Sequence, residues 1–356
     1  MDGMNRAAIS GPTVWRGKDI EDKGAISLEL GGPELDALRS AVDASLEQSL
    51  ESLTPTQFNA PVLDAFMGRV TDQVLHGRGL AIIRGFPVDQ HDEEAIARMF
   101  WGLGLHLGTP VSQSVMGERL GHVIDHSDTD PTGRGYRQRY ELTPHTDFHD
   151  IVTFLCVHQG RTGGMSWFVS GHEIHNQIRD ARPDLLEVLY RGFYTHRFGE
   201  QEANEAAITE HRVPVFAEHQ GLVSCRLLRR YVELAGHESQ PLSNIEHEAL
   251  EYVDQLSMDP QNGLFLMLEP GEAVVMNNYV VFHGRTAYED DGPAQTKRHL
   301  MRLWLVPDPR RAVAPGLYVY ANERRGLGIA PNPGHKPSYD DLDIVGRVYG
   351  DRMPEP

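Results

Sequence analysis

Two histidines and one aspartate are spaced as ligands for a single metal ion. His145 and Asp147 are separated by one residue, and His283 follows far downstream in an apolar segment. Alternate side chains of an extended strand share a face, so His145 and Asp147 would point the same way. Two imidazoles and one carboxylate can fill one face of an octahedral metal and leave the other positions open, as in non-heme Fe(II) oxygenases. The pattern therefore predicts an iron site that can admit a co-substrate and dioxygen.

Two arginines downstream of this pattern could bind a carboxylate. Arg298 and Arg302 are four residues apart in an apolar, strand-like segment, so both would face the same side. A buried carboxylate without a partner is costly, and the guanidinium fork of arginine matches it. Ser166, which follows the glycine pair at 163–164, could donate a hydroxyl to the same group. We expect these residues to hold a dicarboxylic co-substrate whose other end chelates the metal.

A second interpretation uses the same histidine and aspartate differently. Residues 145–150 read His-Thr-Asp-Phe-His-Asp, so His149 and Asp150 could join His145 and Asp147 in a hydrolase-like cluster. Such a metal-dependent hydrolase would work with Zn²⁺ or Mn²⁺ and would not consume dioxygen. This interpretation leaves the two downstream arginines without a role.

The composition narrows the class of partner. The chain has 356 residues and a formal net charge of −18, from 51 acidic and 33 basic residues, which disfavours nucleic acid and anionic membranes as partners. The two cysteines, Cys156 and Cys225, lie in apolar segments and are expected to be buried thiols. No apolar run approaches membrane-spanning length, and the N-terminus lacks the apolar stretch of a signal peptide. We expect a cytoplasmic protein that acts on a small molecule, and a homo-oligomer is compatible with this composition.

The periodicity of apolar residues predicts several helices around many strands. Helices are expected over residues 33–50, 58–76, 91–105, 171–189 and 243–256. Strands are expected over 79–85, 151–157, 163–168, 213–216, 222–227, 263–269, 273–276, 280–283 and 300–306. The polar, turn-rich stretch over 110–143 is expected to be an active-site loop. Residues 1–25 would form an arm anchored by Trp15, and residues 26–356 a single domain with an insertion around 190–260.

The order of the motifs resembles a known family. His-Thr-Asp at 145–147, Gly-Gly-x-Ser at 163–166, the Asn-Asn segment at 277–290 and Arg-His-Leu-x-Arg at 298–302 are similar to the taurine dioxygenase (TauD/TfdA-like) and clavaminate-synthase-like Fe(II)/2-oxoglutarate oxygenases. The resemblance covers about residues 79–306. It implies an α+β protein, mainly β with flanking helices, built on a double-stranded β-helix (jelly-roll) core. A non-catalytic ligand sensor on the same scaffold is the remaining alternative.

The resemblance also implies roles for individual residues. His145, Asp147 and His283 would be the iron ligands, and Arg298 would bind the C5 carboxylate of 2-oxoglutarate. Ser166 stands where the family usually has threonine, and Arg302 matches a position that contacts either substrate or co-substrate. Related halogenases replace the carboxylate with a small residue, so Asp147 favours hydroxylation, with release of succinate and CO2. Iron, 2-oxoglutarate and O2 would then be the cofactor and co-substrates.

The substrate is expected to be small and polar or anionic, such as an amino acid or an organic acid. Arginine and tyrosine donors near the metal would suit a carboxylate or another anionic group. The residues expected to line its pocket are Gln113, Phe148, His149, Arg285, Tyr288 and Arg302.

Overall fold

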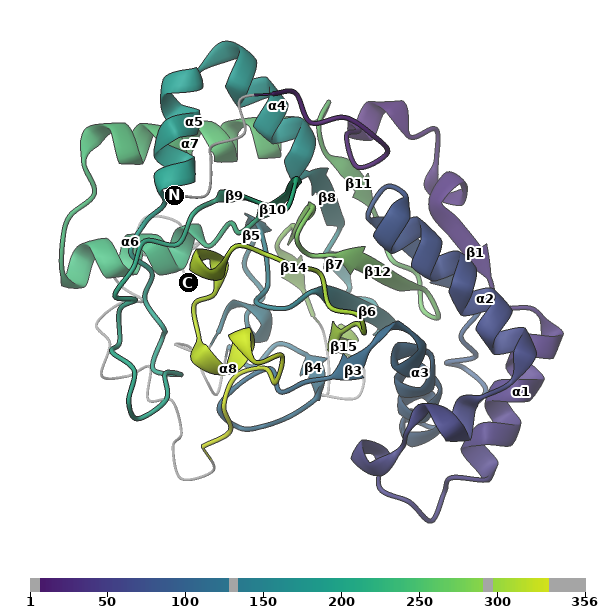
Figure 1. The fold of residues 1–356 in the computed structure, drawn as a ribbon. Coiled ribbons are helices and arrows are strands. Elements are labelled where there is room, and N and C mark those ends of the chain that lie inside the picture. The colour runs from purple at the N-terminus through teal and green to yellow at the C-terminus, as the bar shows by residue number, and fades with distance from the viewer. Residues whose placement is uncertain (1–6, 128–133, 291–296, 333–356) are drawn as a thin grey trace.

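Two facing β-sheets form the centre of the protein, and helices cover them from outside (Figure 1). The computed structural model describes residues 7–127, 134–290 and 297–332. Residues 128–133 of the expected active-site loop and residues 333–356 of the expected domain lie outside this range. None of the described helices is long and apolar enough to cross a membrane.

The larger sheet carries the long central strands. Its order is β1 (Ser27–Glu29), β2 (Leu80–Arg84), β12 (Ala273–Asn277), β6 (Ile151–His158), β15 (His299–Val306) and β3 (Thr109–Pro110), and β4 (Leu120–Val123) also pairs with β15. The smaller sheet has the order β11 (Leu264–Leu266), β8 (Ser166–Ser170), β13 (Val281–Arg285) and β5 (Leu142–His145). Two further pairs are β9 (Phe216–His219) with β10 (Leu222–Cys225) and β7 (Thr162–Gly163) with β14 (Tyr288–Glu289).

Alternation of side chains along the strands divides the core into layers. On β12, Val274 and Met276 belong to the apolar cluster between the two sheets, while Ala273 and Val275 belong to the cluster beneath the helices. This period of two is what a strand covered on both faces requires, and it is why β12 reads as a continuous apolar run. The larger sheet is therefore buried on both sides.

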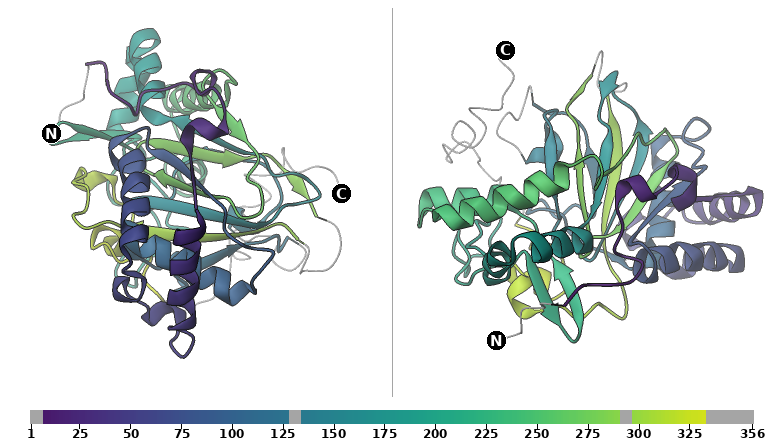
Figure 2. Two further views of the ribbon diagram at one scale, coloured as in Figure 1. Left: turned by 90° about the vertical axis from the view of Figure 1, so that its right-hand side faces the viewer. Right: turned by 90° about the horizontal axis from the view of Figure 1, so that it is seen from above.

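The helices cover the two outer faces (Figure 2). The helices α1 (Gly32–Asp43), α2 (Pro61–Thr71) and α3 (Glu93–Leu107) pack against the larger sheet, and α4 (Gly171–Ala181), α5 (Pro183–Arg191) and α7 (Asn244–Met258) pack beside the smaller one. Helix α6 (Arg229–Glu238) lines the larger cavity described below, and the short α8 (Ala321–Arg324) follows near the end of the described chain. Single helical turns occur at Gly17–Asp19, Lys23–Ile26, Leu50–Ser52, Pro55–Phe58, Asp72–His76, Gly135–Arg137 and Pro315–Leu317.

The structure confirms the α+β class but shifts several predicted elements. The helix expected over 33–50 ends at Asp43 because buried Arg98 donates hydrogen bonds to the carbonyls of Ser45 and Gln48, at 2.9 and 2.7 Å. The prediction placed no helix at α6, which begins without a side-chain cap. The strand expected over 213–216 begins only at Phe216. The expected loop at 110–143 contains β4 and the start of β5.

The N-terminal segment is held against the body of the protein over its described part. Trp15 is buried, and its indole nitrogen donates a hydrogen bond of 2.9 Å to the carbonyl of Arg78. This contact is consistent with Trp15 as an anchor. The division into an arm and one domain with an insertion stays a prediction.

Candidate active site

The two histidines of the predicted triad meet because their strands pair directly. His145 on β5 lies opposite His283 on β13 in the antiparallel register, and their ring centroids are 4.5 Å apart. One ligand atom from each of His145, Asp147 and His283 lies within 4.8 Å of the others. His145 and His283 are 138 residues apart in the sequence but are direct cross-strand neighbours in the fold. The structure brings all three predicted ligands together.

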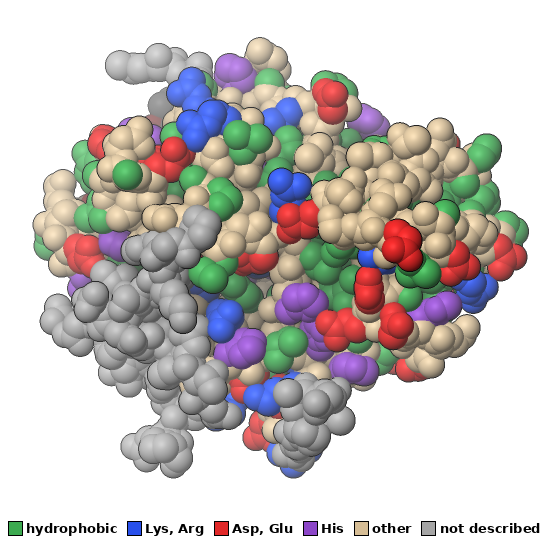
Figure 3. Space-filling model, turned by 90° about the horizontal axis from the view of Figure 1, so that it is seen from below, with side chains coloured by type: hydrophobic (Ala, Val, Ile, Leu, Met, Phe, Trp, Pro, Cys, Tyr) green, Lys and Arg blue, Asp and Glu red, His purple; other side chains and the backbone are tan. Residues whose placement is uncertain are grey.

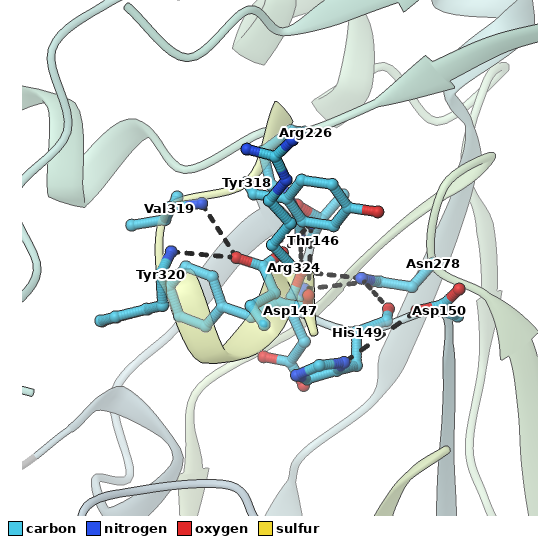
Figure 4. A network of polar contacts seen from close by, with 12 residues as sticks. Thr146, Asp147, His149, Asp150, Arg226, Asn278, Tyr318, Val319, Tyr320 and Arg324 are labelled. Atoms are coloured by element: carbon cyan, nitrogen blue, oxygen red, sulfur yellow. Dashed lines mark hydrogen bonds and ion pairs between the residues drawn. The ribbon is translucent and has the colours of Figure 1, made fainter. Parts of the chain in front are cut away.

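Asp147 reaches this position differently from the prediction. Strand β5 ends at His145, so the two ligands do not share one strand. Instead Asn278 holds the backbone of Asp147: its side-chain oxygen accepts from the Asp147 N–H at 2.9 Å, and its amide donates to the Asp147 carbonyl at 2.7 Å. Arg226 donates to the same carbonyl (Figure 4). Hydrogen bonds from distant segments therefore position Asp147, where the sequence analysis expected the alternation of side chains along one strand to do so.

Hydrogen bonds also orient the ligand side chains. Nδ1 of His145 lies 2.8 Å from the carbonyl of Thr143, so this nitrogen carries the proton and Nε2 is left for a metal. Oδ2 of Asp147 accepts from Nε1 of Trp304 at 2.8 Å and from Nη1 of Arg302 at 3.3 Å. The other carboxylate oxygen is not engaged by these donors. Two imidazoles and one oriented carboxylate oxygen are the donor set of a facial iron site, so the residues present fit Fe(II).

The charges around the triad favour the protonation states that metal ligands need. Burial lowers the pKa of His145, and burial together with the neighbouring His145 ring lowers that of His283 to about 3. Burial alone would raise the pKa of Asp147, but Arg302 and the two histidines outweigh it and hold that pKa well below its usual range. Near pH 7 the triad therefore presents two neutral imidazoles and one carboxylate.

A small inner cavity lies between the two sheets beside the triad. Its volume is about 60 Å³, and its lining includes Phe154, Ser166, His283, Arg285, Arg298 and Arg302. Arg298 is 4% exposed, and its Nη1 has no hydrogen-bond partner within the described part of the chain. A side chain at Gly164 would meet Nε of Arg298 at 2.9 Å, so glycine there leaves room for the guanidinium. A buried guanidinium with a nitrogen that has no partner among the described residues is arranged to bind an anion in this cavity.

Arg302 lines the inner cavity and also donates a hydrogen bond to Asp147. Its Nε donates to Oε1 of Gln113 at 2.6 Å, and the Gln113 amide donates back to the Arg302 carbonyl at 2.8 Å. Its guanidinium also stacks on Tyr136 and Trp304, 4.6 and 4.9 Å from the ring centroids. Gln113 therefore positions Arg302 and does not line either cavity described here, which corrects its predicted contact with substrate.

A larger outer cleft of about 840 Å³ opens on the other side of the triad. His145, Asp147 and Arg302 lie at its base, and Tyr136, Tyr140, Phe148, Phe198, Arg230 and Tyr231 line its walls. Nη1 of Arg230 donates to the Tyr140 hydroxyl at 3.0 Å. Prediction from sequence found Phe148 but missed Arg230 and Tyr231, because they belong to the uncapped helix α6 and no motif marks them.

His149, Arg285 and Tyr288 were also predicted to contact substrate, but none of them lines the outer cleft. His149 is fully buried beside Trp304, with ring centroids 5.6 Å apart, and lines neither cavity because residues 148–150 bend away from the strand direction. Arg285 lines the inner cavity but donates to the carbonyls of Gly135, Gln138 and Tyr140. Tyr288 lies beneath Arg285 and Arg298, 4.7 and 4.9 Å from their guanidinium carbons.

The alternative hydrolase cluster is not assembled. Asp150 forms an ion pair with Arg310 at 2.9 Å, and neither Asp150 nor His149 belongs to the group of ligand atoms around His145 in the described structure. Burial, with Arg310 and Arg226 nearby, lowers the pKa of His149 well below its usual value, so the ring is neutral. Asn278 also holds this segment, because its amide donates a hydrogen bond of 2.7 Å to the His149 carbonyl (Figure 4).

Comparison with known proteins identifies relatives that are named as dioxygenases, which agrees with the assembled triad. The family model described as taurine catabolism dioxygenase TauD, TfdA family matches residues 49–304. FR-33289 synthase of Streptomyces rubellomurinus (strain ATCC 31215) is 30% identical over 339 residues, which cover 92% of this chain and 98% of that protein. A uridine-5′-phosphate dioxygenase of an Amycolatopsis species is 26% identical over 220 residues, covering 58% of this chain and 78% of the relative.

The fold is also similar to that of a solved structure. Asparagine oxygenase in complex with Fe(II), 2S,3S-3-hydroxyasparagine and succinate superposes with a TM-score of 0.59 at 18% sequence identity, covering 79% of this chain and 93% of the other. This likeness confirms the predicted jelly-roll core with flanking helices.

Proposed function

The chain belongs to the taurine catabolism dioxygenase TauD, TfdA family, and from this premise we propose that it hydroxylates an aliphatic C–H bond of a small polar or anionic substrate. The protein is an Fe(II)- and 2-oxoglutarate-dependent dioxygenase. When bound, Fe(II) supplies the activation of O2, with decarboxylation of 2-oxoglutarate to succinate and CO2. The observation that carries the proposal is the assembled triad between a cationic inner cavity and an open outer cleft.

We assign the metal to His145, Asp147 and His283. The contact from Thr143 fixes the His145 ring, while Trp304 and Arg302 hold one oxygen of Asp147 in place. Because these partners belong to the folded chain, the ligands need little reorganisation when the metal binds. This support from surrounding residues distinguishes the triad from three polar side chains that are close by chance.

We assign 2-oxoglutarate to the inner cavity. Arg298 at its far wall would bind the C5 carboxylate, and the Ser166 hydroxyl would donate to the same group. His283 borders the cavity, so the keto-acid end of the molecule would face the metal. The apolar walls at Phe154, Phe168 and Leu300 exclude water from the carboxylate–arginine contact, which strengthens it.

We assign the substrate to the outer cleft. Arg230 and the Tyr140 hydroxyl present donors on one wall, and Phe148, Phe198 and Tyr231 present aromatic faces. This mixture suits a molecule with an anionic group and an apolar portion that reaches the metal. One relative is named for uridine 5′-phosphate and a structural neighbour holds hydroxyasparagine, so polar and anionic substrates occur among similar proteins.

Anaerobic addition of Fe(II) and 2-oxoglutarate is expected to produce a weak visible charge-transfer band in the wild-type protein. The band requires the metal and the keto acid to be bound together, so His145→Ala should abolish it. Absorption difference spectra measure the effect. His76→Ala, which removes an exposed histidine, is the matched control and should keep the band. Bound iron without a band in the wild type would contradict the proposed function.

Removal of Arg230 is expected to weaken the binding of an anionic substrate selectively. A hydrogen bond to a charged group contributes about 1.5–3 kcal/mol, so Arg230→Ala should raise the KM for substrate roughly 10- to 100-fold. The affinity for 2-oxoglutarate should be unchanged, because Arg230 does not line the inner cavity. Amino acids, organic acids and nucleoside monophosphates are first screened for substrate-stimulated succinate formation. An unchanged KM for the best anionic substrate would assign its recognition elsewhere.

We propose further that the protein acts in the cytoplasm on a small molecule, without a nucleic-acid or membrane partner. The net charge of −18 supports the absence of such partners, since nucleic acids and anionic membranes would be repelled. The cleft donors act locally and are compatible with that overall charge.

A further inference from the structure

Three potential metal ligands also meet at a second place, at the edge of the larger sheet. Glu93 is the first residue of α3, His122 lies on β4 and His299 begins β15. One ligand atom from each lies within 4.8 Å of the others, and this group shares no residue with the triad. The face seen from below gathers histidine and acidic side chains beside one another near its centre (Figure 3).

The separations of these atoms are close to those of a metal site. Nδ1 of His122 lies 2.9 Å from Nε2 of His299 and 3.7 Å from Oε1 of Glu93. Ligands bonded to zinc at about 2.0–2.1 Å in tetrahedral geometry stand about 3.3 Å apart. Shifts of about 0.4 Å in these two separations, within the freedom of exposed side chains, would bring His122 to tetrahedral distances from both partners.

One of the three side chains is buried and held in place, and the other two are exposed and free to adjust. His299 is 5% exposed and is held in the sheet, whereas the side chains of His122 and Glu93 are 42% and 61% exposed. His158 lies directly opposite His299 in the β6–β15 pairing and adds another imidazole at the same edge.

We propose that Glu93, His122 and His299 bind a second divalent transition-metal ion of the zinc type, with water completing the coordination. Nitrogen and carboxylate ligands in this ratio suit Zn²⁺. The site would tie the start of α3 and strand β4 to the start of β15. Because His299 directly follows Arg298, it would also hold the segment that carries the co-substrate arginine.

The two metal sites can be separated by combining substitutions. The His145→Ala/His283→Ala variant lacks two ligands of the triad and retains the second site, so it should still bind one equivalent of Zn²⁺. Adding His122→Ala should weaken this binding at least ~100-fold, the upper range of what even a lost supporting contact causes. Titration calorimetry with Zn²⁺ measures both, and circular dichroism checks that each variant is folded.

Two further variants make the test decisive. Glu93→Gln alters only an exposed side chain and should weaken Zn²⁺ binding in the triad-deficient background, while His76→Ala should not. Co²⁺ bound to the triad-deficient protein should show visible d–d absorption that His122→Ala removes. If the triad-deficient protein binds no Zn²⁺, or binds it equally well after His122→Ala, the second site does not exist. Neither result would affect the proposed dioxygenase activity.

Discussion

Replacement of Arg298 by alanine is expected to lower the affinity for 2-oxoglutarate by roughly two to four orders of magnitude. The reason is that the C5 carboxylate would remain buried without its partner, at a cost of about 3–5 kcal/mol. Arg298 is suited to this role because it is buried in the wall of the inner cavity and its Nη1 has no hydrogen-bond partner among the described residues. Growth of the charge-transfer band during an anaerobic 2-oxoglutarate titration, or calorimetry with Fe(II) present, measures the change.

Companion variants separate this role from that of Arg302. Arg298→Lys should recover only part of the affinity, since an ammonium cannot form two parallel hydrogen bonds. Arg302→Ala should change 2-oxoglutarate affinity less and instead uncouple decarboxylation from hydroxylation, because Arg302 also holds Asp147. Arg191→Ala, at a half-exposed residue that lines neither cavity, should leave the affinity unchanged. If Arg302→Ala proves more damaging to 2-oxoglutarate binding than Arg298→Ala, the assignment of Arg298 is wrong.

Loss of Arg226 is expected to destabilise the fold by about 3–5 kcal/mol, as for other buried ion pairs that lose one partner. Both Arg226 and Glu323 have fully buried side chains and lie 2.5 Å apart. Arg226 also donates to the backbone carbonyls of Asp147 and Phe148, and Glu323 accepts from the N–H groups of Val319 and Tyr320. The pair thus ties residues 319–323 to the backbone at Asp147, and Figure 4 shows Arg226, Val319 and Tyr320 in this network.

Urea unfolding of Arg226→Met measures this loss. The double variant Arg226→Met/Glu323→Leu should be less destabilised than the sum of the two single variants, because no unpaired charge then remains buried. Iron affinity should fall in Arg226→Met as well, since the Asp147 backbone loses a support. Arg39→Ala, which removes an exposed partner of Asp36, should scarcely change stability. Additive effects in the double variant would show that the pair acts as two separate contacts.

Local spacing in the sequence was sufficient for the chemistry of the site and for many of its elements. His145, Asp147 and His283 were recognisable because two imidazoles and a carboxylate in one order suit few other purposes. Arg298 stood out because a charged residue bordering an apolar strand needs a function or a partner. The helices and most central strands followed from the period of their apolar residues, which reflects burial on one or both faces.

Only the tertiary structure determined how distant segments meet. Periodicity specifies which face of a strand is buried but not which strand it pairs with, so the His145–His283 register could not be read from spacing. Several other contacts join residues that no local sequence pattern marks as neighbours. They are the support of Asp147 by Asn278 and Arg226, the ion pair of Arg226 with Glu323, and the cleft wall formed by α6. His149 carried the same apparent metal-binding signal as His145 and His283, but the bend after Asp147 keeps it out of the assembled triad. Such contacts depend on long-range packing, and so the sequence determined the reaction type while the fold decided which residues surround it.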